Sequence, residues 1–217
     1  EALKLWTLTL SLMAGIKTTL LLFLIVIVLS LPLGFLVTLL LRSRIKPVRW
    51  ISTAFVYVVR GTPLLLQLMF LYLGLPFIPV IGEYLTFSRW TAALLGFTIN
   101  YAAYFAEIFR GGLLAVDKGQ YEAAQVLGLS RRQTIVKVVL PQMIRVALPS
   151  VTNESVTLVK DTSLLYAVSV PDLLHFTKTT VSRTADPTAF VVAGVIYLLM
   201  NTVLTLLFKK LEQKYDY

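Results

Sequence analysis

Residues 18–41 read TTLLLFLIVIVLSLPLGFLVTLLL, a run without a single charged side chain. The hydrocarbon core of a bilayer is about 30 Å thick, and an α-helix needs roughly 20 apolar residues to cross it. The strongest interruption, Pro32 close to Gly34, is a kink that a buried membrane helix tolerates. This stretch therefore predicts a transmembrane helix, and it decides the fold class.

The rest of the chain has the same character. Of its 217 residues, 57% are hydrophobic and 14% charged, with a mean hydropathy of +0.80, outside the balance of a soluble domain. A net charge of +9 would suggest a nucleic-acid partner in a soluble protein. Here it is explained by basic residues that collect in the loops between membrane spans. There is no cysteine and one histidine, so we expect no metal site. From the hydropathy and the placement of the charges we expect a lipid membrane around the chain and no nucleic-acid partner.

Five segments are long and apolar enough to cross the bilayer. They lie near residues 16–41, 50–75, 89–115, 143–169 and 188–208. We predict that residues 1–15 form a separate interfacial helix before the first span, with Trp6 at the headgroup boundary. Because no internal repeat is visible, the expected architecture is one all-α transmembrane domain over residues 1–217.

The basic residues predict the orientation of these spans. Most of them follow the first, third and fifth spans: Arg42, Arg44, Lys46, Arg49, Lys118, Arg131, Arg132, Lys137, Lys209, Lys210 and Lys214. Loops rich in Lys and Arg stay in the cytoplasm. We therefore expect the N-terminus outside, and both the C-terminus and the loop of residues 118–141 in the cytoplasm.

That cytoplasmic loop carries signals for a short helix between two turns. Glu122 lies near a helix start, where a negative charge is favourable, and Gly128 suits the left-handed position that ends a helix. Ser130 and Gln133 have capping-box spacing, so a second helix is expected to begin there, with a bend at Pro141. The first helix would be about 15 Å long. By composition alone it could be an ordinary interfacial helix.

Charged side chains inside membrane spans are costly, and they usually face the bundle interior or a water-filled path. Five stand out here: Arg60, Glu107, Glu154, Lys160 and Asp161. Glu154 and Asp161 are seven residues apart, which puts them on one helix face about 10 Å apart, with Thr157 between them. That separation suits a ligand with charges at both ends.

Two further groups are predicted to complete a substrate site. Asn100, Tyr104 and Glu107 recur at helical spacing and could form the opposite wall. The sequence Arg60-Gly61-Thr62-Pro63 predicts a helix break whose Arg60 meets a substrate carboxylate. The predicted substrate residues are Arg60, Thr62, Asn100, Tyr104, Glu154, Thr157 and Asp161. Two structural alternatives stay open, a Glu107–Arg110 pair and an Arg60–Asp161 salt bridge.

Several stretches resemble a known family, the ABC importer permeases. The pattern Glu122-Ala123-Ala124, then Gly128, then Leu140-Pro141 resembles their EAA loop, which forms a coupling helix docked on a separate ATPase. RGTPLLLQL (60–68), YAAYFAEIFRGGLLAVDKGQYEAAQVLG (101–128) and LVKDTSLL (158–165) resemble the polar amino acid subfamily, related to histidine and glutamine importers. The resemblance implies the type I importer permease fold with five transmembrane helices.

The resemblance also implies partners. It implies two ATPase subunits that bind ATP and magnesium, a second permease chain that is identical or closely related, and an extracytoplasmic substrate-binding protein, all at the plasma or inner membrane. This chain has no GxxxxGK[ST] phosphate loop. We therefore expect a chain that is not an enzyme and holds no cofactor of its own.

An acidic excess in the predicted site favours a basic amino acid, arginine, lysine or histidine, as the substrate. Three alternatives remain at this point. The chain could be an ion-coupled secondary carrier in which Glu154 and Asp161 bind a cation. It could be an importer of glutamine or glutamate whose selectivity lies only in the binding protein, or a scaffold whose loop recruits a cytoplasmic protein.

Overall fold

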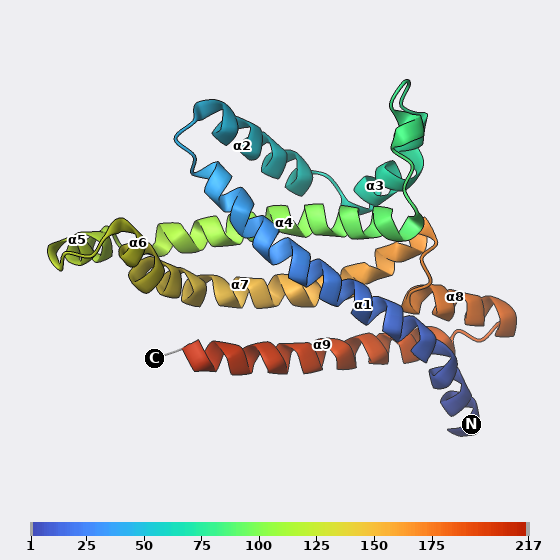
Figure 1. The fold of residues 1–217 in the computed structure, drawn as a ribbon. Helices are drawn as coiled ribbons and strands as arrows, with labels where there is room; N and C mark the ends of the chain where they lie inside the picture. Colours follow the sequence, from blue (N-terminus) through green and yellow to red (C-terminus); the bar gives the residue numbers. More distant parts are fainter. Residues whose placement is uncertain (1, 216–217) are drawn as a thin grey trace.

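The computed structural model describes residues 2–215, and within them it is helical without strands (Figure 1). In this part of the chain, four helices are long and apolar enough to cross a membrane: α1 (Ala2–Leu41), α4 (Arg89–Ala115), α7 (Leu140–Asp161) and α9 (Thr188–Tyr215). A bent pair, Lys46–Gly61 and Leu64–Phe77, makes a fifth when it is counted as one broken span. The expected all-α membrane architecture is confirmed.

Helix α1 is one continuous helix, so the prediction of a separate interfacial helix over residues 1–15 is wrong. Tertiary packing explains the difference. Leu12 is fully buried in a cluster with Leu173 and Ile196, and Gly15 lies so close to the backbone of Leu173 that a Cβ atom would clash there. The early part of α1 is therefore held by α8 (Leu173–Thr184) and α9. Glu1 lies outside the described residues.

Near its other end, α1 crosses α4 at close range. Gly34 faces Phe105, with no room for a Cβ atom. The hydroxyl of Thr38 donates hydrogen bonds to the carbonyl oxygen of Gly34 at 3.0 Å and to that of Ala106 at 2.9 Å. Small residues at a membrane helix crossing allow backbones to approach closely. The crossing therefore fixes α4, which carries one wall of the site described below.

The second span is broken, as the sequence predicts. Helix α2 (Lys46–Gly61) ends before Thr62 and Pro63, which are extended, and α3 (Leu64–Met69) starts at an angle of 105° to it. Pro63 lacks a backbone N–H and cannot continue the hydrogen-bond ladder of α2. A π-helical turn, η1 (Phe70–Gly74), and two short 3-10 turns, η2 (Leu75–Phe77) and η3 (Gly82–Tyr84), complete this segment.

Between the last two spans lies a short helix that we did not predict. Helix α7 continues as a 3-10 turn, η5 (Thr162–Val168), and α8 (Leu173–Thr184) follows. The carboxylate of Asp172 caps α8 by accepting hydrogen bonds from the backbone N–H groups of Leu174 and His175. Because Asp172 is buried, loss of solvation raises the pKa of its carboxyl group to about 6.

Candidate functional site

The break between α2 and α3 opens onto a polar cavity of about 550 Å³. Its walls are residues of α2, α3, α4 and α7 with the start of η5: Arg60, Gly61, Thr62, Pro63, Leu64, Leu65, Asn100, Tyr101, Tyr104, Glu154, Thr157, Asp161 and Leu164. All seven residues that the sequence suggested for substrate binding line this one cavity. The structure thus brings them together from separate helices, while their role as ligands stays a prediction.

The two carboxylates of α7 have different surroundings in the cavity. The hydroxyl of Tyr101 donates a hydrogen bond of 2.7 Å to Oδ2 of Asp161. Within residues 2–215 the carboxylate of Glu154 has no hydrogen bond or ion pair, although it is partly buried. A partly buried carboxylate without a partner is costly, so Glu154 is the group most in need of a cationic ligand.

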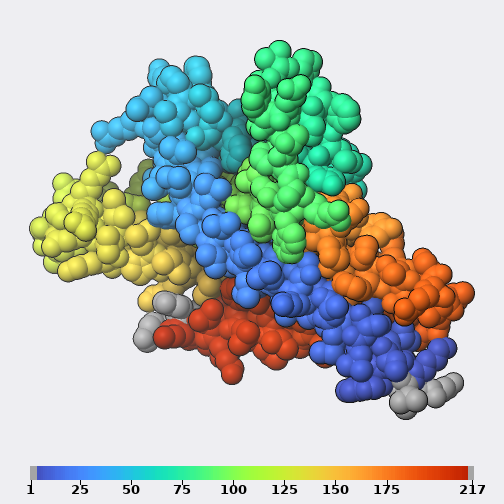
Figure 2. Space-filling view, turned by 45° about the vertical axis from the view of Figure 1, so that its right-hand side comes forward, coloured from blue at the N-terminus to red at the C-terminus, as the bar shows by residue number. Residues whose placement is uncertain are grey.

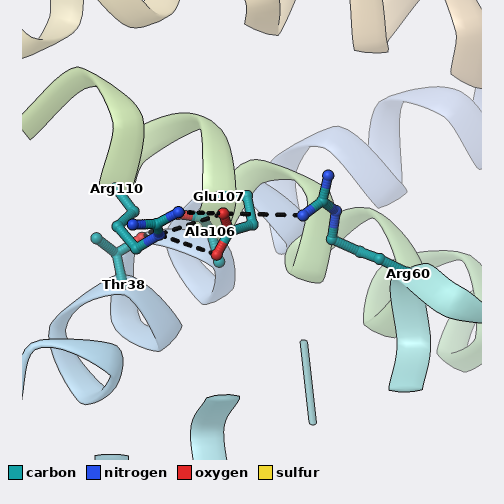
Figure 3. Close-up of polar contacts among 5 residues, drawn as sticks. All are labelled: Thr38, Arg60, Ala106, Glu107 and Arg110. Atoms are coloured by element: carbon teal, nitrogen blue, oxygen red, sulfur yellow. Dashed lines mark hydrogen bonds and ion pairs between the residues drawn. The ribbon is translucent and has the colours of Figure 1, made fainter. Parts of the chain in front are cut away.

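Arg60 also lines the cavity and lies next to α4. Its guanidinium stands over the ring of Tyr104, 5.2 Å from the ring centre, and its Nη1 is 3.8 Å from Oε2 of Glu107. The same carboxylate accepts hydrogen bonds from Nε of Arg110 at 3.0 Å and from Nη2 at 2.7 Å, as Figure 3 shows. Glu107 therefore lies between two guanidiniums.

This arrangement resolves the two structural alternatives. The Glu107–Arg110 pair is formed, whereas Arg60 contacts Glu107 and not Asp161. Glu107, which could have formed part of the opposite wall, does not line the polar cavity; its side chain lines a separate cavity between α1, α2 and α4, and its contacts favour the structural pair with Arg110. Arg110, one turn further along α4, holds the carboxylate there. The polar cavity is lined by two carboxylates and one guanidinium, which gives it a net negative charge.

Gln67 of α3 is a structural residue of the site that sequence reasoning missed. Its amide Nε2 donates hydrogen bonds to the carbonyl oxygen of Val59 at 2.8 Å and to Oγ1 of Thr62 at 2.7 Å. Its Oε1 accepts a hydrogen bond of 3.0 Å from Nδ2 of Asn100. One side chain thus ties both ends of the break to α4. The sequence does contain a signal for it, because Gln67 is a single polar residue within the apolar run that follows Pro63.

Residues 117–141, named here the cytoplasmic segment after their predicted location, have the two helices and the turn that the sequence predicts, but the first helix begins before Glu122, which lies in its middle. Helix α5 (Lys118–Val126) begins at Asp117, whose Oδ1 accepts a hydrogen bond from the N–H of Gly119. The chain turns at Gly128, which has a φ of +71°, the left-handed value. Helix α6 (Arg131–Thr134) then begins with the complete capping box between Ser130 and Gln133.

The transition into the membrane differs from the bend predicted at Pro141. A π-helical turn, η4 (Ile135–Val139), joins α6 to α7 without a break, and Pro141 lies in the first turn of α7. Proline cannot donate to the carbonyl four residues earlier, and a π turn widens the helix where that bond is missing. The result is one continuous helical stretch, Arg131–Val168.

The cytoplasmic segment exposes apolar side chains at its tip. Val126 is 88% exposed and Leu127 is 78% exposed, next to the exposed Glu122 and Ala123. Ala124, by contrast, is buried. Val126 and Leu127 thus present a small exposed apolar surface beside the turn.

Comparison with known proteins gives consistent matches. Residues 30–217 match the family described as binding-protein-dependent transport system inner membrane component. The chain is 38% identical over 202 residues to the probable amino-acid ABC transporter permease protein YckA of Bacillus subtilis, covering 93% of this chain and 87% of that protein. It is 33% identical over 170 residues to the arginine ABC transporter permease protein ArtM of Escherichia coli, covering 76% of each.

A solved structure matches over nearly the full length. The crystal structure of an amino acid ABC transporter with histidines superposes with a TM-score of 0.88 at 29% identity, covering 99% of this chain and 98% of that one. An inward-facing structure of the MetNI methionine ABC transporter gives a TM-score of 0.74 at 22% identity and supports the fold alone.

Proposed function

This chain belongs to the family of binding-protein-dependent transport system inner membrane components, and from that premise we propose that it is the permease subunit of an ATP-driven importer of basic amino acids. The polar cavity carries the proposal. Glu154 and Asp161 offer two carboxylates to a substrate with two cationic groups, and Arg60 offers a guanidinium to its carboxylate. Charge-assisted hydrogen bonds of this kind are among the strong ones.

The names of similar proteins agree with a basic substrate but also point to variation. The arginine transport system permease protein ArtQ of Bacillus subtilis is 33% identical to this chain over 203 residues. The L-cystine transport system permease protein TcyB of the same organism is 31% identical over 204 residues. The charges in the cavity therefore support a basic substrate more directly than these names do. An importer of glutamine or glutamate, with selectivity only in the binding protein, is the second candidate.

We assign ATPase coupling to the cytoplasmic segment. The residues that we assign to coupling are the EAA group, the turn glycine and the entry to α7: Glu122, Ala123, Ala124, Gly128, Leu140 and Pro141. Ala124 is buried, so its part is to hold the shape of the segment. The exposed Val126 and Leu127 would enter a groove on an ATPase subunit, which binds and hydrolyses ATP with magnesium. Because Arg131–Val168 is one helical stretch, a displacement of this segment reaches Glu154 and Asp161 directly.

The complete transporter would contain two ATPases, two permease chains and an extracytoplasmic binding protein. The basic loops support an N-terminus outside and a C-terminus in the cytoplasm. Cysteines introduced near positions 85 and 180 should then be labelled from outside, and those near 46 and 118 from inside. The opposite labelling pattern would reverse the topology and remove the cytoplasmic role of residues 117–141.

Uptake into vesicles tests the function. The complex is reconstituted with its binding protein, and radiolabelled arginine, lysine, histidine, glutamine and glutamate are offered with or without ATP on the ATPase side. We expect ATP-dependent uptake of a basic amino acid. Uptake driven by a sodium or proton gradient without an ATPase would show a secondary carrier. Uptake of glutamine or glutamate alone would favour the second candidate.

A further inference from the structure

A larger cavity lies at the cytoplasmic end of the molecule, away from the substrate site. It has a volume of about 700 Å³ and is enclosed by the ends of α1 and α4, by α5 and by the α6–η4 segment. In Figure 2 the yellow residues of α5 and η4 lie at the same end of the molecule as the light-blue end of α1. Of the residues assigned above to substrate binding or coupling, only Leu140 lines this cavity.

The lining of this cavity combines two kinds of chemistry. Phe35, Leu113 and Ile135 belong to an apolar floor, whereas Arg42 and Arg131 bring two guanidiniums to it. No Asp or Glu is among the lining residues. Within the described residues, neither of these two arginine side chains has a hydrogen bond or an ion pair. The cavity therefore has two unneutralised cations above an apolar surface.

The depth of the cavity follows from the chain. Arg42 comes directly after the apolar run of residues 18–41, so it lies where a membrane helix leaves the hydrocarbon core. The surface of the cytoplasmic leaflet is rich in anionic lipids, and basic pockets between membrane helices on that side bind their headgroups. A soluble anion would leave the apolar floor unused, and a zwitterionic lipid would carry its own cation to the guanidiniums.

We propose that this cavity is a binding site for one anionic phospholipid, whose phosphate is held by Arg42 and Arg131 and whose acyl chain covers the apolar floor. Tyr121 of α5, the residue before Glu122, also lines the cavity. The lipid would therefore fill the space behind the coupling segment and support its position. This part rests on the proposed function, because it needs residues 117–141 to face the cytoplasm and the ATPase.

The test uses the complete transporter in nanodiscs of phosphatidylcholine with or without one fifth phosphatidylglycerol. Phosphatidylglycerol retained after transfer to detergent is measured by native mass spectrometry, and ATP hydrolysis is measured in the nanodiscs. The lining variant is Arg42→Gln with Arg131→Gln. The control is Arg44→Gln with Arg132→Gln, which removes the same charge from the same two segments but outside the cavity. Monodispersity confirms that each complex is folded.

We expect wild type and control to retain about one phosphatidylglycerol per permease chain. The lining variant should retain at least fivefold less. Phosphatidylglycerol should stimulate ATP hydrolysis severalfold in wild type and control, and hardly at all in the lining variant. Arg42→Lys with Arg131→Lys should restore part of the retention, because it keeps both charges.

Three results would overturn the proposal. These are an absence of retained lipid in wild type, equal losses in lining and control variants, and unchanged retention in the lining variant. Retention that follows the expected pattern in a complex without amino acid uptake would refute the proposed function and leave the lipid site intact.

Discussion

The cytoplasmic segment and the polar cavity are built in opposite ways. The turns of the segment are held by hydrogen bonds between residues that are close in the sequence, such as Ser130 and Gln133. The bonds of the cavity join distant residues, Gln67 to Asn100 and Tyr101 to Asp161. The segment can therefore move as a unit and keep its shape. The cavity must change shape whenever its helices move, which an alternating-access site requires.

The largest effect is expected in the cavity, from Glu154→Gln. This change keeps the size of the side chain but removes the unpaired carboxylate. A hydrogen bond to a charged group contributes about 1.5–3 kcal/mol, equivalent to roughly 10- to 100-fold in affinity. Uptake of a basic amino acid at low concentration should fall by that factor, while ATPase co-purification stays normal. Unchanged uptake would place selectivity in the binding protein.

The next effect tests the segment through Gly128, whose φ is +71°. The left-handed conformation costs an ordinary residue about 1–2 kcal/mol, and Asn tolerates it better. Gly128→Val should reduce substrate-stimulated ATP hydrolysis about tenfold without changing substrate binding, whereas Gly128→Asn should be close to wild type. If Val and Asn behave alike, the turn does not depend on its backbone conformation, and the local account of the segment fails.

A pair of glutamines compares the two regions directly. Gln67 forms hydrogen bonds with residues of α2 and α4. Gln142 instead forms hydrogen bonds with Gln120 and the carbonyl oxygen of Val138, which both belong to the segment. Gln67→Leu leaves the amide of the buried Asn100 without its acceptor and should weaken uptake about fivefold, the equivalent of roughly 1 kcal/mol. Gln142→Leu should change uptake less. Equal effects would show that the cavity is no more interdependent than the segment.

The smallest effect concerns Asp172, where a local cap is buried by tertiary packing. Its carboxyl pKa is about 6 in the folded chain against an ordinary value of 3.8, so the folded chain holds the proton to higher pH. Stability therefore falls as pH rises through this window, by about 1 kcal/mol between pH 5 and pH 7.

Thermal unfolding of wild type and Asp172→Asn at several pH values measures that contribution. Asn also caps helices, so the variant should keep α8 and lose this part of the pH dependence. Two parallel pH profiles would mean that burial does not perturb Asp172.

Much of the fold was readable from the sequence because its signals are local. The apolar runs gave the spans, Pro63 gave the broken helix, and Gly128 with the capping box gave the turns. Helical spacing also placed Glu154 and Asp161 on one face. These features depend on residues within one or two turns of each other.

Other features required the packed molecule. The continuity of α1 depends on Leu12 and Gly15 meeting α8, which sequence spacing does not encode. Glu107 has helical spacing suited to the substrate wall, but its side chain lies with Arg110 and Arg60. Tyr101 and Gln67 act through partners on other helices and were not identified as site residues. Cross-helix partners were the information that the sequence lacked.

The unbroken α1 has a mechanical consequence. A helix of 40 residues is about 60 Å long, at 1.5 Å per residue. One end borders the arginine-lined cavity, and near the other end Lys4 forms an ion pair of 2.8 Å with Asp186, just before α9. With the Thr38 crossing as a pivot, a tilt of about 5° would displace the Lys4 end of α1, together with the parts of α8 and α9 packed on it, by several ångströms. A small displacement at the Arg42 end would thus become a larger one at the Lys4 end.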